Sequence, residues 1–409
     1  MSDAKKIKLN IEALCVYEVK GDPVISALSE LVSSAETEAV VENYARLYKA
    51  VAPFKSLKHY IEGLILENDN AFTRTACSGE ALSGELLTAV KLDLQKLHEI
   101  SLINKAFIYG SIKDEALKFT LETMPELPVS TDETKVLKGD WENCTPELIN
   151  FHRQNGFGIF VNHKAFGWKG EKLLPIKSVN PITLSDLKRY DSQKAQVVDN
   201  TESFLKGLPA NNILLYGDRG TGKSSTVHAI LNEYAREGLR LVEISKAEIS
   251  ELTKIREALE NIPLKFIIFI DDLSFDKEDN AFGALKSALE GSLVNKAVNT
   301  LIYATSNRRH LIRESFSDRQ NDVNRNDILQ EQLSLSDRFG LTITYVNPGK
   351  SGYLDIVEKI AEDRGLNVNT EHLFFVAEQW ATKKGGRSPR CAKQFVDFVE
   401  SAEKRGKAW

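Results

Sequence analysis

The segment at 217–225, GDRGTGKSS, contains the residue types and the spacing that phosphate binding requires. It fits the pattern G-x-x-x-x-G-K-[ST], in which glycines allow positive φ angles and bring backbone N–H groups close to an anion. The lysine reaches the β- and γ-phosphates of a nucleotide, and the following hydroxyl can bind Mg²⁺. We therefore expect this loop to hold a nucleoside triphosphate. The predicted contacts are Gly217, Asp218, Arg219, Gly220, Thr221, Gly222, Lys223, Ser224 and Ser225.

The surrounding sequence has the strand–loop–helix order that such a loop needs. The apolar run NILLY at 212–216 precedes the loop, and a helical pattern, STVHAILNEYA at 225–235, follows it. A helix that begins at the loop adds the positive end of its dipole to the site. The alternative is a glycine-rich turn that binds nothing, and the context favours the phosphate site.

A pair of acids provides the second chemical feature. The run FIIFI at 266–270 leads directly into Asp271 and Asp272. An acid at the carboxyl end of a buried parallel strand faces the ligand crevice of an α/β sheet. We expect Asp271 to hold Mg²⁺ through water and Asp272 to orient or deprotonate the attacking water. The alternative is an ordinary turn after a strand that contains two acids.

Five apolar runs that alternate with helical patterns, within 186–348, must position these residues. The runs are ILLY, LRLVEI, FIIFI, TLIYA and LTITYV. Strands this continuously apolar, separated by helices, predict a parallel sheet that is covered on both faces. Residues 349–409 show three amphipathic helical stripes, which predict a small helical domain after the α/β core.

The chain before this core has a different texture. Residues 1–150 space their apolar side chains three and four apart, which predicts a mostly helical domain. A recruitment or regulatory module and a simple packing domain both fit this pattern. Residues 151–185 are rich in glycine and aromatics, and we expect a connector with short strands, such as a small hairpin. His152 and His163 lie there without nearby carboxylates or thiols, which favours surface residues over metal ligands.

Composition limits the class of protein. The 409 residues are too many for one ordinary core, which predicts two or three domains. A formal net charge of −5 gives no global signal for nucleic acid. Four widely spaced cysteines indicate neither a zinc site nor a disulfide framework. The N-terminus lacks an apolar signal-like region, and no apolar stretch of about 18 residues occurs, so we expect a cytoplasmic protein that does not bind membranes.

In chain order, the loop, the acid pair and three later segments make the chain similar to AAA+ ATPases. The later segments are TLIYATSNRRH, SLSDRFG and GGRSPRCAKQF. More narrowly, the chain resembles a bacterial AAA+ family known only as a domain of unknown function, over roughly residues 175–405. The phrases LLYGDRGTGKSS, DDLSF, YATSNRRHL and LSDRFGL carry this resemblance. It implies a P-loop NTPase core with a five-stranded parallel sheet, a C-terminal helical lid, and ATP and Mg²⁺ as cofactors.

The resemblance also implies roles for single residues. Asn307, at the end of the fourth strand, matches the polar sensor that contacts the γ-phosphate or the attacking water. Arg338 matches the arginine finger that a neighbouring subunit inserts toward the γ-phosphate, a task that suits an always-charged guanidinium. In the helical lid, Arg390 matches the second sensor, and Arg387 is its rival. The alternatives are that Asn307 is an ordinary turn residue after a strand and that these arginines lie on the surface without such a role.

Other positions are weaker candidates. Ser388 can cap the second-sensor helix, and Pro389 suits its first turn. Upstream, Tyr190 and Asp191 lie where such ATPases contact adenine, although a turn before any helix has a similar pattern. The stretch at 245–265 lacks the aromatic–glycine pore loop of threading unfoldases, which argues against polypeptide translocation.

Two further features bear on partners and rate. The segment at 308–325 contains several arginines that suit a nucleic-acid backbone, but acids are interleaved with them, which favours a solvated or subunit-interface surface. Asp272 stands where many ATPases of this type have glutamate. Its side chain is one methylene shorter, which favours slow hydrolysis.

Together these features predict a Mg²⁺-dependent ATPase that remodels or switches an unidentified macromolecular partner, with ATP held between the core and the lid. An arginine finger at Arg338 acting in trans implies a homo-oligomer whose activity depends on assembly. One alternative is a slow-hydrolysing loader or switch, which Asp272 favours. The other is a nucleic-acid-dependent ATPase.

Overall fold

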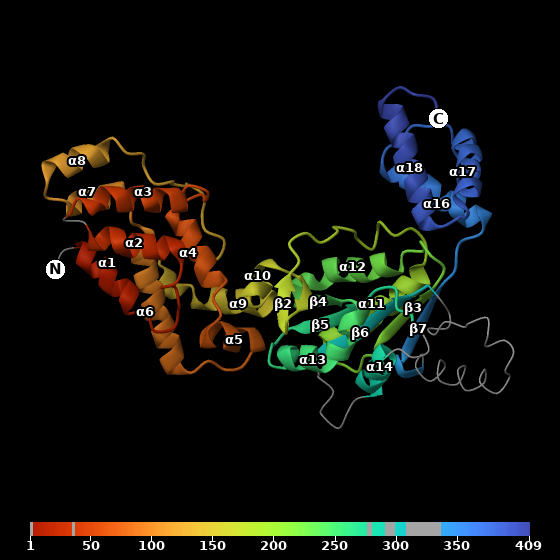
Figure 1. Ribbon diagram of the computed structural model, residues 1–409, viewed down its shortest axis with the longest axis horizontal. Helices are drawn as coiled ribbons and strands as arrows, with labels where there is room; N and C mark the ends of the chain where they lie inside the picture. Colours follow the sequence, from red (N-terminus) through yellow and green to blue (C-terminus); the bar gives the residue numbers. More distant parts are fainter. Residues whose placement is uncertain (1–2, 35–36, 276–279, 291–298, 308–336) are drawn as a thin grey trace. The chain divides into compact units, whose positions relative to one another are not determined.

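The computed structural model describes residues 3–34, 37–275, 280–290, 299–307 and 337–409 (Figure 1). The chain divides into two compact units. Unit 1 comprises Met1–Asn162 with Ile262–Leu264, and unit 2 comprises His163–Asn261 with Lys265–Trp409.

Unit 1 is mostly helical, as the apolar spacing of residues 1–150 predicted (Figure 1). The residues that follow this spacing form one core, in which side chains such as Leu28, Leu47 and Leu94 are fully buried. The described elements are α1 Asp3–Glu12, α2 Pro23–Ser33, α3 Ala39–Val51, α4 Leu57–Leu66, α5 Ala71–Ser78, α6 Gly84–Ser101, α7 Lys105–Ser111, α8 Glu115–Glu122, the 3₁₀ turn η1 Trp141–Asn143, α9 Thr145–Asn155 and α10 Ile159–Asn162.

Two buried carboxylates fasten loops of unit 1 to its helices. The carboxylate of Asp93 in α6 accepts the backbone N–H groups of residues 15–17 at 2.7–3.3 Å. The carboxylate of Glu62 in α4 accepts those of residues 135–137 at 2.7–3.0 Å. Several N–H donors replace the water that each carboxylate loses on burial. Both acids therefore serve the fold of unit 1.

His152 corrects the expectation of a surface histidine. Its ring is fully buried in α9, and its Nδ1 lies 2.8 Å from the carbonyl oxygen of Gly156. Phe72 and Phe151 lie edge-on to the ring, so the imidazole fills an aromatic part of the core. Burial lowers the pKa of His152 to about 4, which keeps the ring neutral near pH 7.

Unit 2 contains the sheet that the five apolar runs predicted. Those runs form β3 to β7, which lie parallel in the order β4-β5-β6-β3-β7. All residues of β6 are buried, and β4 and β5 each have one residue that is not, which agrees with a sheet covered on both faces. The bounds are β3 Ile213–Gly217, β4 Leu239–Ile244, β5 Lys265–Ile270, β6 Thr300–Ser306 and β7 Leu341–Tyr345.

The expected count of five strands was wrong, because the sheet has seven strands within the described residues. The connector forms a hairpin of β1 Ala165–Lys169 and β2 Lys172–Pro175. Its two-residue turn, Gly170 and Glu171, has positive φ at both positions, as a type I′ turn requires. β1 pairs in parallel with β4, so the hairpin covers backbone groups that β4 would otherwise leave unpaired.

Helices and short turns connect the strands of the core. The described elements are α11 Asp191–Leu205, α12 Lys223–Tyr234, η2 Ala235–Glu237, η3 Lys246–Glu251, α13 Leu252–Glu260 and α14 Asn280–Glu290. α12 follows β3 directly through the glycine-rich loop, so the helix begins at the predicted phosphate site. This is the strand–loop–helix order that the sequence predicted.

The last part of unit 2 is the predicted helical lid, with α16 Lys350–Asp363, α17 Thr370–Lys384 and α18 Pro389–Lys404. Its three apolar stripes meet in one small core that contains Tyr353, Ala377 and Phe395. The Ser388 hydroxyl caps α18 by accepting the N–H of Cys391 at 3.2 Å, and Pro389 occupies the first turn, as expected.

None of the helices in the described residues is long and apolar enough to cross a membrane. All four cysteines are free thiols. Within the same residues, no group of three or more His, Cys, Asp and Glu side chains is arranged to hold a metal ion by itself.

Candidate functional site

The predicted chemical groups meet at one edge of the sheet. β5, β6 and β3 are neighbours and run parallel, so their carboxyl ends lie side by side. The glycine-rich loop follows β3, the acid pair follows β5, and Asn307 follows β6. The topology of an α/β sheet places ligand sites at this edge.

The three glycines of the loop all have positive φ, at 133° for Gly217, 75° for Gly220 and 97° for Gly222. Two of them also lack room for a side chain. A Cβ on Gly217 would lie 1.9 Å from the Tyr345 carbonyl oxygen, and one on Gly220 would lie 2.9 Å from the Ser388 hydroxyl. The glycines therefore permit both the loop conformation and its close approach to β7 and to the lid.

Lys223 lies at the start of α12 and is 6% exposed. Its ammonium group donates to the carbonyl oxygens of Gly217 at 3.0 Å and Asp218 at 2.7 Å, and to Oδ1 of Asn307 at 3.1 Å. Burial is the main cause that lowers the pKa of Lys223. These three acceptors are neutral, so they orient the ammonium group without neutralising its charge.

Asp271 connects the loop to the end of β6. Its Oδ1 accepts hydrogen bonds from the Ser224 hydroxyl at 2.6 Å and from the Thr305 hydroxyl at 2.5 Å. Ser224 and Asp271 are the two residues that the sequence predicts to hold Mg²⁺. The structure brings their oxygen atoms together, and oxygen ligands are those that Mg²⁺ prefers.

Asp272 is directed away from its neighbour, toward Asn307. The Asn307 amide donates to Oδ1 of Asp272 at 2.6 Å, and the Asp272 backbone N–H donates to the Thr305 hydroxyl at 2.9 Å. Asp272 has φ of +50°, in the left-handed region that few residues other than glycine adopt. Because Lys223 donates to the same Asn307, a continuous chain of hydrogen bonds joins the loop to the second acid.

These groups line a pocket of about 400 Å³. Its charged and polar lining comes from the loop, from the ends of β5 and β6, and from the lid. The lining residues are Arg219, Gly220, Gly222, Lys223, Ser224, Ser225, Asp271, Asp272, Thr305, Asn307 and Arg390.

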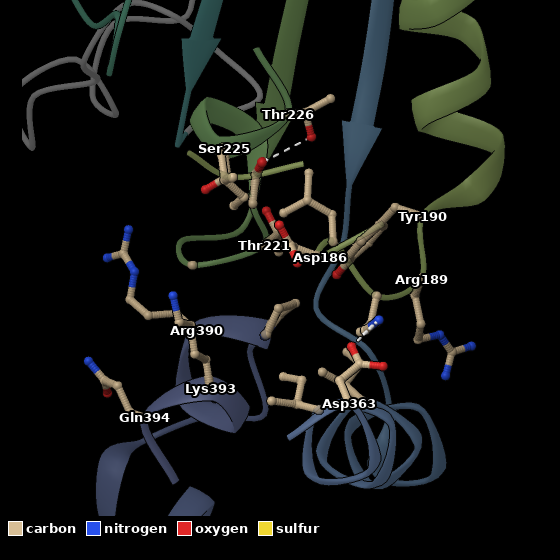
Figure 2. A pocket seen from close by; sticks show the side chains of 18 of the residues that line it. Asp186, Arg189, Tyr190, Thr221, Ser225, Thr226, Asp363, Arg390, Lys393 and Gln394 are labelled. Atoms are coloured by element: carbon tan, nitrogen blue, oxygen red, sulfur yellow. Dashed lines mark hydrogen bonds and ion pairs between the residues drawn. The ribbon is translucent and has the colours of Figure 1, made fainter. Parts of the chain in front are cut away.

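A second pocket, of about 780 Å³, adjoins the loop on its other side. It lies among the segment before α11, the loop and the lid helices α16 and α18. Figure 2 shows Thr221, Ser225 and Thr226 on the core side of this pocket and Arg390 and Lys393 on the lid side. Gly220, Gly222, Ser225 and Arg390 line both pockets, so a ligand of sufficient length can occupy the two together.

Of the two predicted adenine contacts, the structure brings only one to a pocket. Tyr190 lines the larger pocket, with its ring 5.1 Å from that of Tyr345 and its hydroxyl donating to the Val346 carbonyl oxygen at 2.9 Å. Burial is the main cause that raises the pKa of Tyr190 to about 12. Asp191 is largely exposed, pairs with Lys194 at 2.9 Å and lines neither pocket.

The lid arginines have different surroundings. Arg387 forms a two-pronged ion pair with Glu378 inside the lid, at 3.0 and 2.8 Å. The Arg390 side chain lines both pockets, and its backbone N–H donates to the Gly220 carbonyl oxygen at 3.1 Å. This geometry favours Arg390 over Arg387 as the arginine that meets a ligand.

Arg338 does not line either pocket of its own chain. It stands just before Phe339, which is fully buried and anchors the chain ahead of β7. The arginine-rich segment at 308–325 lies outside the described residues. Of the four residues predicted to take part in catalysis, the structure therefore brings together Asp272, Asn307 and Arg390.

The sequence prediction omitted two residues that line these pockets, Thr305 and Tyr345. A signal existed for Thr305, since it precedes Asn307 by two residues in a strand, and side chains two apart point to the same face. Tyr345 ends the last apolar run, where a buried tyrosine is ordinary. Its hydroxyl lies 3.2 Å from that of Thr226, which identifies it as part of the larger pocket's wall only in three dimensions.

Comparison with known proteins points in the same direction as the geometry. The family described as "Protein of unknown function (DUF815)" matches residues 161–403. The large subunit of replication factor C from Staphylothermus marinus is 42% identical over 69 residues, which cover 17% of this chain and 16% of the relative. An AAA-ATPase from Arabidopsis thaliana is 24% identical over 181 residues, which cover 41% of this chain and 33% of the relative.

The chain thus spans about a sixth to a third of the length of these curated relatives. Among solved structures, the Thermotoga maritima RuvB Holliday junction branch migration motor is similar at 15% sequence identity and a TM-score of 0.38. That alignment covers 56% of this chain and 68% of RuvB. A likeness at this level carries no argument about function.

Proposed function

This chain belongs to the family described as "Protein of unknown function (DUF815)" and is an AAA+ protein, and from that premise we propose that it binds ATP and hydrolyses it. Hydrolysis would remodel or switch an unidentified macromolecular partner. ATP would lie across the two adjoining pockets, with its phosphates in the smaller one and its base in the larger one beside Tyr190. The cytoplasmic location expected from the sequence stays a prediction.

One observation carries the proposal. Lys223, the acid pair and Asn307 converge at the ends of three adjacent strands, beside a loop whose glycines have positive φ. Within the described residues, the acceptors of the buried Lys223 ammonium group are neutral oxygens, so the group forms no direct ion pair and its charge is available to an anion. The N-terminus of α12 adds the positive end of a helix dipole to the same place.

The residues present fit a bound Mg²⁺ ion. Ser224 and Asp271, whose oxygens lie 2.6 Å apart, would hold it. When bound, the ion neutralises negative charge on the phosphate oxygens. The chain's own groups then have separate tasks. Lys223 binds phosphate, and Asp272, held by Asn307 at 2.6 Å, accepts a proton from the attacking water.

Assembly supplies the remaining part of the proposal. Arg338 lines neither pocket of its own chain, which suits a residue that acts on the nucleotide of a neighbouring subunit. Such an arginine finger is worth on the order of 10³-fold or more in rate in related phosphoryl-transfer systems. We therefore propose a homo-oligomer in which each interface completes one active site.

The test is ATP binding by calorimetry in the presence of Mg²⁺. Lys223→Ala should abolish binding, because the variant loses the ammonium group that would contact the β- and γ-phosphates. Lys206→Ala is the matched control, since Lys206 directly follows the last residue of α11 and lines neither pocket. If the wild-type chain binds no adenine nucleotide, or if Lys223→Ala binds as the wild type does, the proposal is wrong.

A second candidate is a slow-hydrolysing switch that uses bound ATP to load or hold a partner. Asp272 favours it, because its carboxylate is shorter than glutamate and is already engaged by Asn307. A third candidate, a nucleic-acid-dependent ATPase, is supported by the arginine-rich sequence at 308–325 and by the name of the replication factor relatives. Turnover that rises with added DNA and falls steeply with salt would support it, and unchanged turnover at low salt would exclude it.

A further inference from the structure

Thr305 holds a distinct position between the two acids. It lies near the carboxyl end of β6 and is 2% exposed. Its hydroxyl donates to Oδ1 of Asp271 at 2.5 Å and accepts the backbone N–H of Asp272 at 2.9 Å. Within the described residues, it is the one side chain that hydrogen-bonds to both acids.

The backbone around Thr305 fastens the same turn. Its carbonyl oxygen accepts the N–H of Leu273 at 2.7 Å, and the Ser306 hydroxyl donates to the Leu273 carbonyl oxygen at 2.8 Å. Residues 271–273 are therefore attached to residues 305–306 by four hydrogen bonds. Two of the four depend on a single hydroxyl group, and a hydroxyl has one proton to donate. That proton is committed to Asp271, and an oxygen lone pair is committed to Asp272.

This attachment explains how two adjacent acids point in different directions. Asp272 has φ of +50°, a conformation that persists only when its surroundings impose it. The hydrogen bond from the Asp272 N–H to Thr305 lies just after the end of β5. With this bond in place, the Asp271 side chain is directed toward Ser224 and the Asp272 side chain toward Asn307.

We propose that Thr305 is a positioning residue that separates the two acids, keeping Asp271 on the metal-holding side and Asp272 on the water side. This inference rests on the proposed ATPase function. The hydroxyl acts through the acids and touches neither nucleotide nor metal. Removal of a group that orients a ligating carboxylate typically lowers metal affinity or activity 10- to 100-fold.

The chain offers a matched set of variants. Thr305→Val preserves the shape of the side chain and removes the hydroxyl, whereas Thr305→Ser preserves the hydroxyl. Thr300→Val is the control, because Thr300 lies at the other end of the same strand and its buried hydroxyl has no hydrogen-bond partner within the described residues. Thr305→Ala replaces Thr305→Val if the valine variant does not fold.

The first readout needs no ligand. Hydrogen exchange of the Asp272 amide, measured by mass spectrometry on a peptide that begins at residue 268 and ends at residue 275, should be slow in wild type, Thr305→Ser and Thr300→Val. It should be faster in Thr305→Val, because the amide loses its acceptor. Equal exchange in wild type and Thr305→Val would overturn the inference, whether or not the protein binds ATP.

The second readout is ATP binding by calorimetry over a series of Mg²⁺ concentrations. Mg²⁺ is expected to increase the affinity for ATP. In Thr305→Val, the Mg²⁺ concentration that gives half of this increase should rise about tenfold or more, whereas the ATP affinity in the absence of Mg²⁺ should not change. Thr305→Ser should behave as wild type. If the required Mg²⁺ concentration rises as far in Thr305→Ser as in Thr305→Val, the hydroxyl is not responsible and the inference is wrong. If wild type binds no ATP, the proposed function fails, and the exchange experiment still decides the role of Thr305.

Discussion

The side-chain amide of Asn307 links two groups of opposite charge. Its oxygen accepts from Lys223 at 3.1 Å, and its nitrogen donates to Asp272 at 2.6 Å. An amide is the group that satisfies both neighbours, because it carries a donor and an acceptor side by side. If Lys223 turns to a bound phosphate, as we propose, its hydrogen bond to Asn307 is one of three contacts that can change. We therefore propose that Asn307 transmits the binding of a nucleotide to Asp272.

This arrangement makes the length of the second acid a testable variable. We predict that Asp272→Glu lowers steady-state phosphate release on the order of 10²-fold, because a longer side chain displaces the carboxylate from its contact with Asn307. Glutamate also fits the left-handed backbone at this position less readily than aspartate does. ATP affinity should stay near that of wild type, since the loop is unchanged.

The opposite result has a clear meaning as well. Faster phosphate release in Asp272→Glu would show that aspartate limits hydrolysis, and it would favour the slow switch over the proposed ATPase. Asp272→Asn is the reference for zero turnover in both cases, because an amide accepts no proton from water at neutral pH.

Residue types and spacing were sufficient to predict much of this site. The pattern around Lys223 and the apolar run before Asp271 predicted the groups that the structure brings together. Spacing did not predict Thr305, because its importance comes from a hydrogen bond across two strands whose pairing the sequence does not state. It also did not exclude Asp191, whose side chain is exposed, pairs with Lys194 and lines neither pocket.

At the scale of elements, α18 decides which lid arginine reaches the pockets. Ser388 and Pro389 begin the helix, so Arg390 lies in its first turn beside Gly220, whereas Arg387 precedes the cap. Spacing alone left the two arginines equivalent. The choice depends on the partner of Arg387, which is Glu378 on α17, a contact between the segment before α18 and another helix.

We therefore predict different results for the two arginines. Arg390→Ala should weaken ATP binding about tenfold or more, because a hydrogen bond to a charged group contributes about 1.5–3 kcal/mol. Arg387→Ala should leave ATP affinity unchanged. It should lower the free energy of unfolding only slightly, since the ion pair with Glu378 is partly exposed to water.

Calorimetry on both variants, with thermal unfolding as the second measurement, checks this prediction. Loss of ATP affinity in Arg387→Ala together with normal binding in Arg390→Ala would reverse the assignment of the second sensor.

The sheet shows where reasoning from elements was incomplete. Continuous apolar runs predicted β3 to β7 because those strands are buried on both faces. β1 and β2 are short, and some of their residues are exposed, so their sequence predicted only a connector with a small hairpin. Their place in the sheet depends on pairing with the edge of β4, which is a tertiary contact.

At the scale of the whole molecule, charge is unevenly divided. Residues 1–162 contain 17 Lys and Arg against 24 Asp and Glu, a net of −7, whereas residues 163–409 contain 36 against 34, a net of +2. The overall charge of −5 is therefore the sum of an acidic unit 1 and a nearly neutral unit 2. An acidic surface repels a phosphate backbone, which argues against unit 1 as a nucleic-acid binding module.

The proposed trans arginine makes a prediction about assembly. Lys223→Ala should lack ATP binding but retain Arg338, and Arg338→Ala should bind ATP but lack the finger, so neither should hydrolyse ATP alone. Mixing equal amounts should restore turnover. For random assembly of head-to-tail interfaces, about a quarter of wild-type turnover is expected, since half of the subunits bind ATP and half of their neighbours supply the arginine.

Phosphate release from the mixture, measured against each variant alone, tests this directly. If Arg338→Ala has wild-type turnover, Arg338 is not an arginine finger. If the mixture is as inactive as its two components, Arg338 does not act in trans. Wild type mixed with Lys223→Ala serves as the control for exchange of subunits.

The hydrogen bond between the Arg390 backbone N–H and the Gly220 carbonyl oxygen has one more consequence. It joins main chain to main chain, so it does not depend on the side chain at position 390, provided that this residue is not proline. Position 220 is different, because its positive φ and the nearby Ser388 leave no room for a side chain. Relatives that keep the glycine can therefore preserve this hydrogen bond with another residue at position 390. A comparison of sequences does not reveal this hydrogen bond, although any movement of the C-terminal helices relative to the glycine-rich loop must bend or break it.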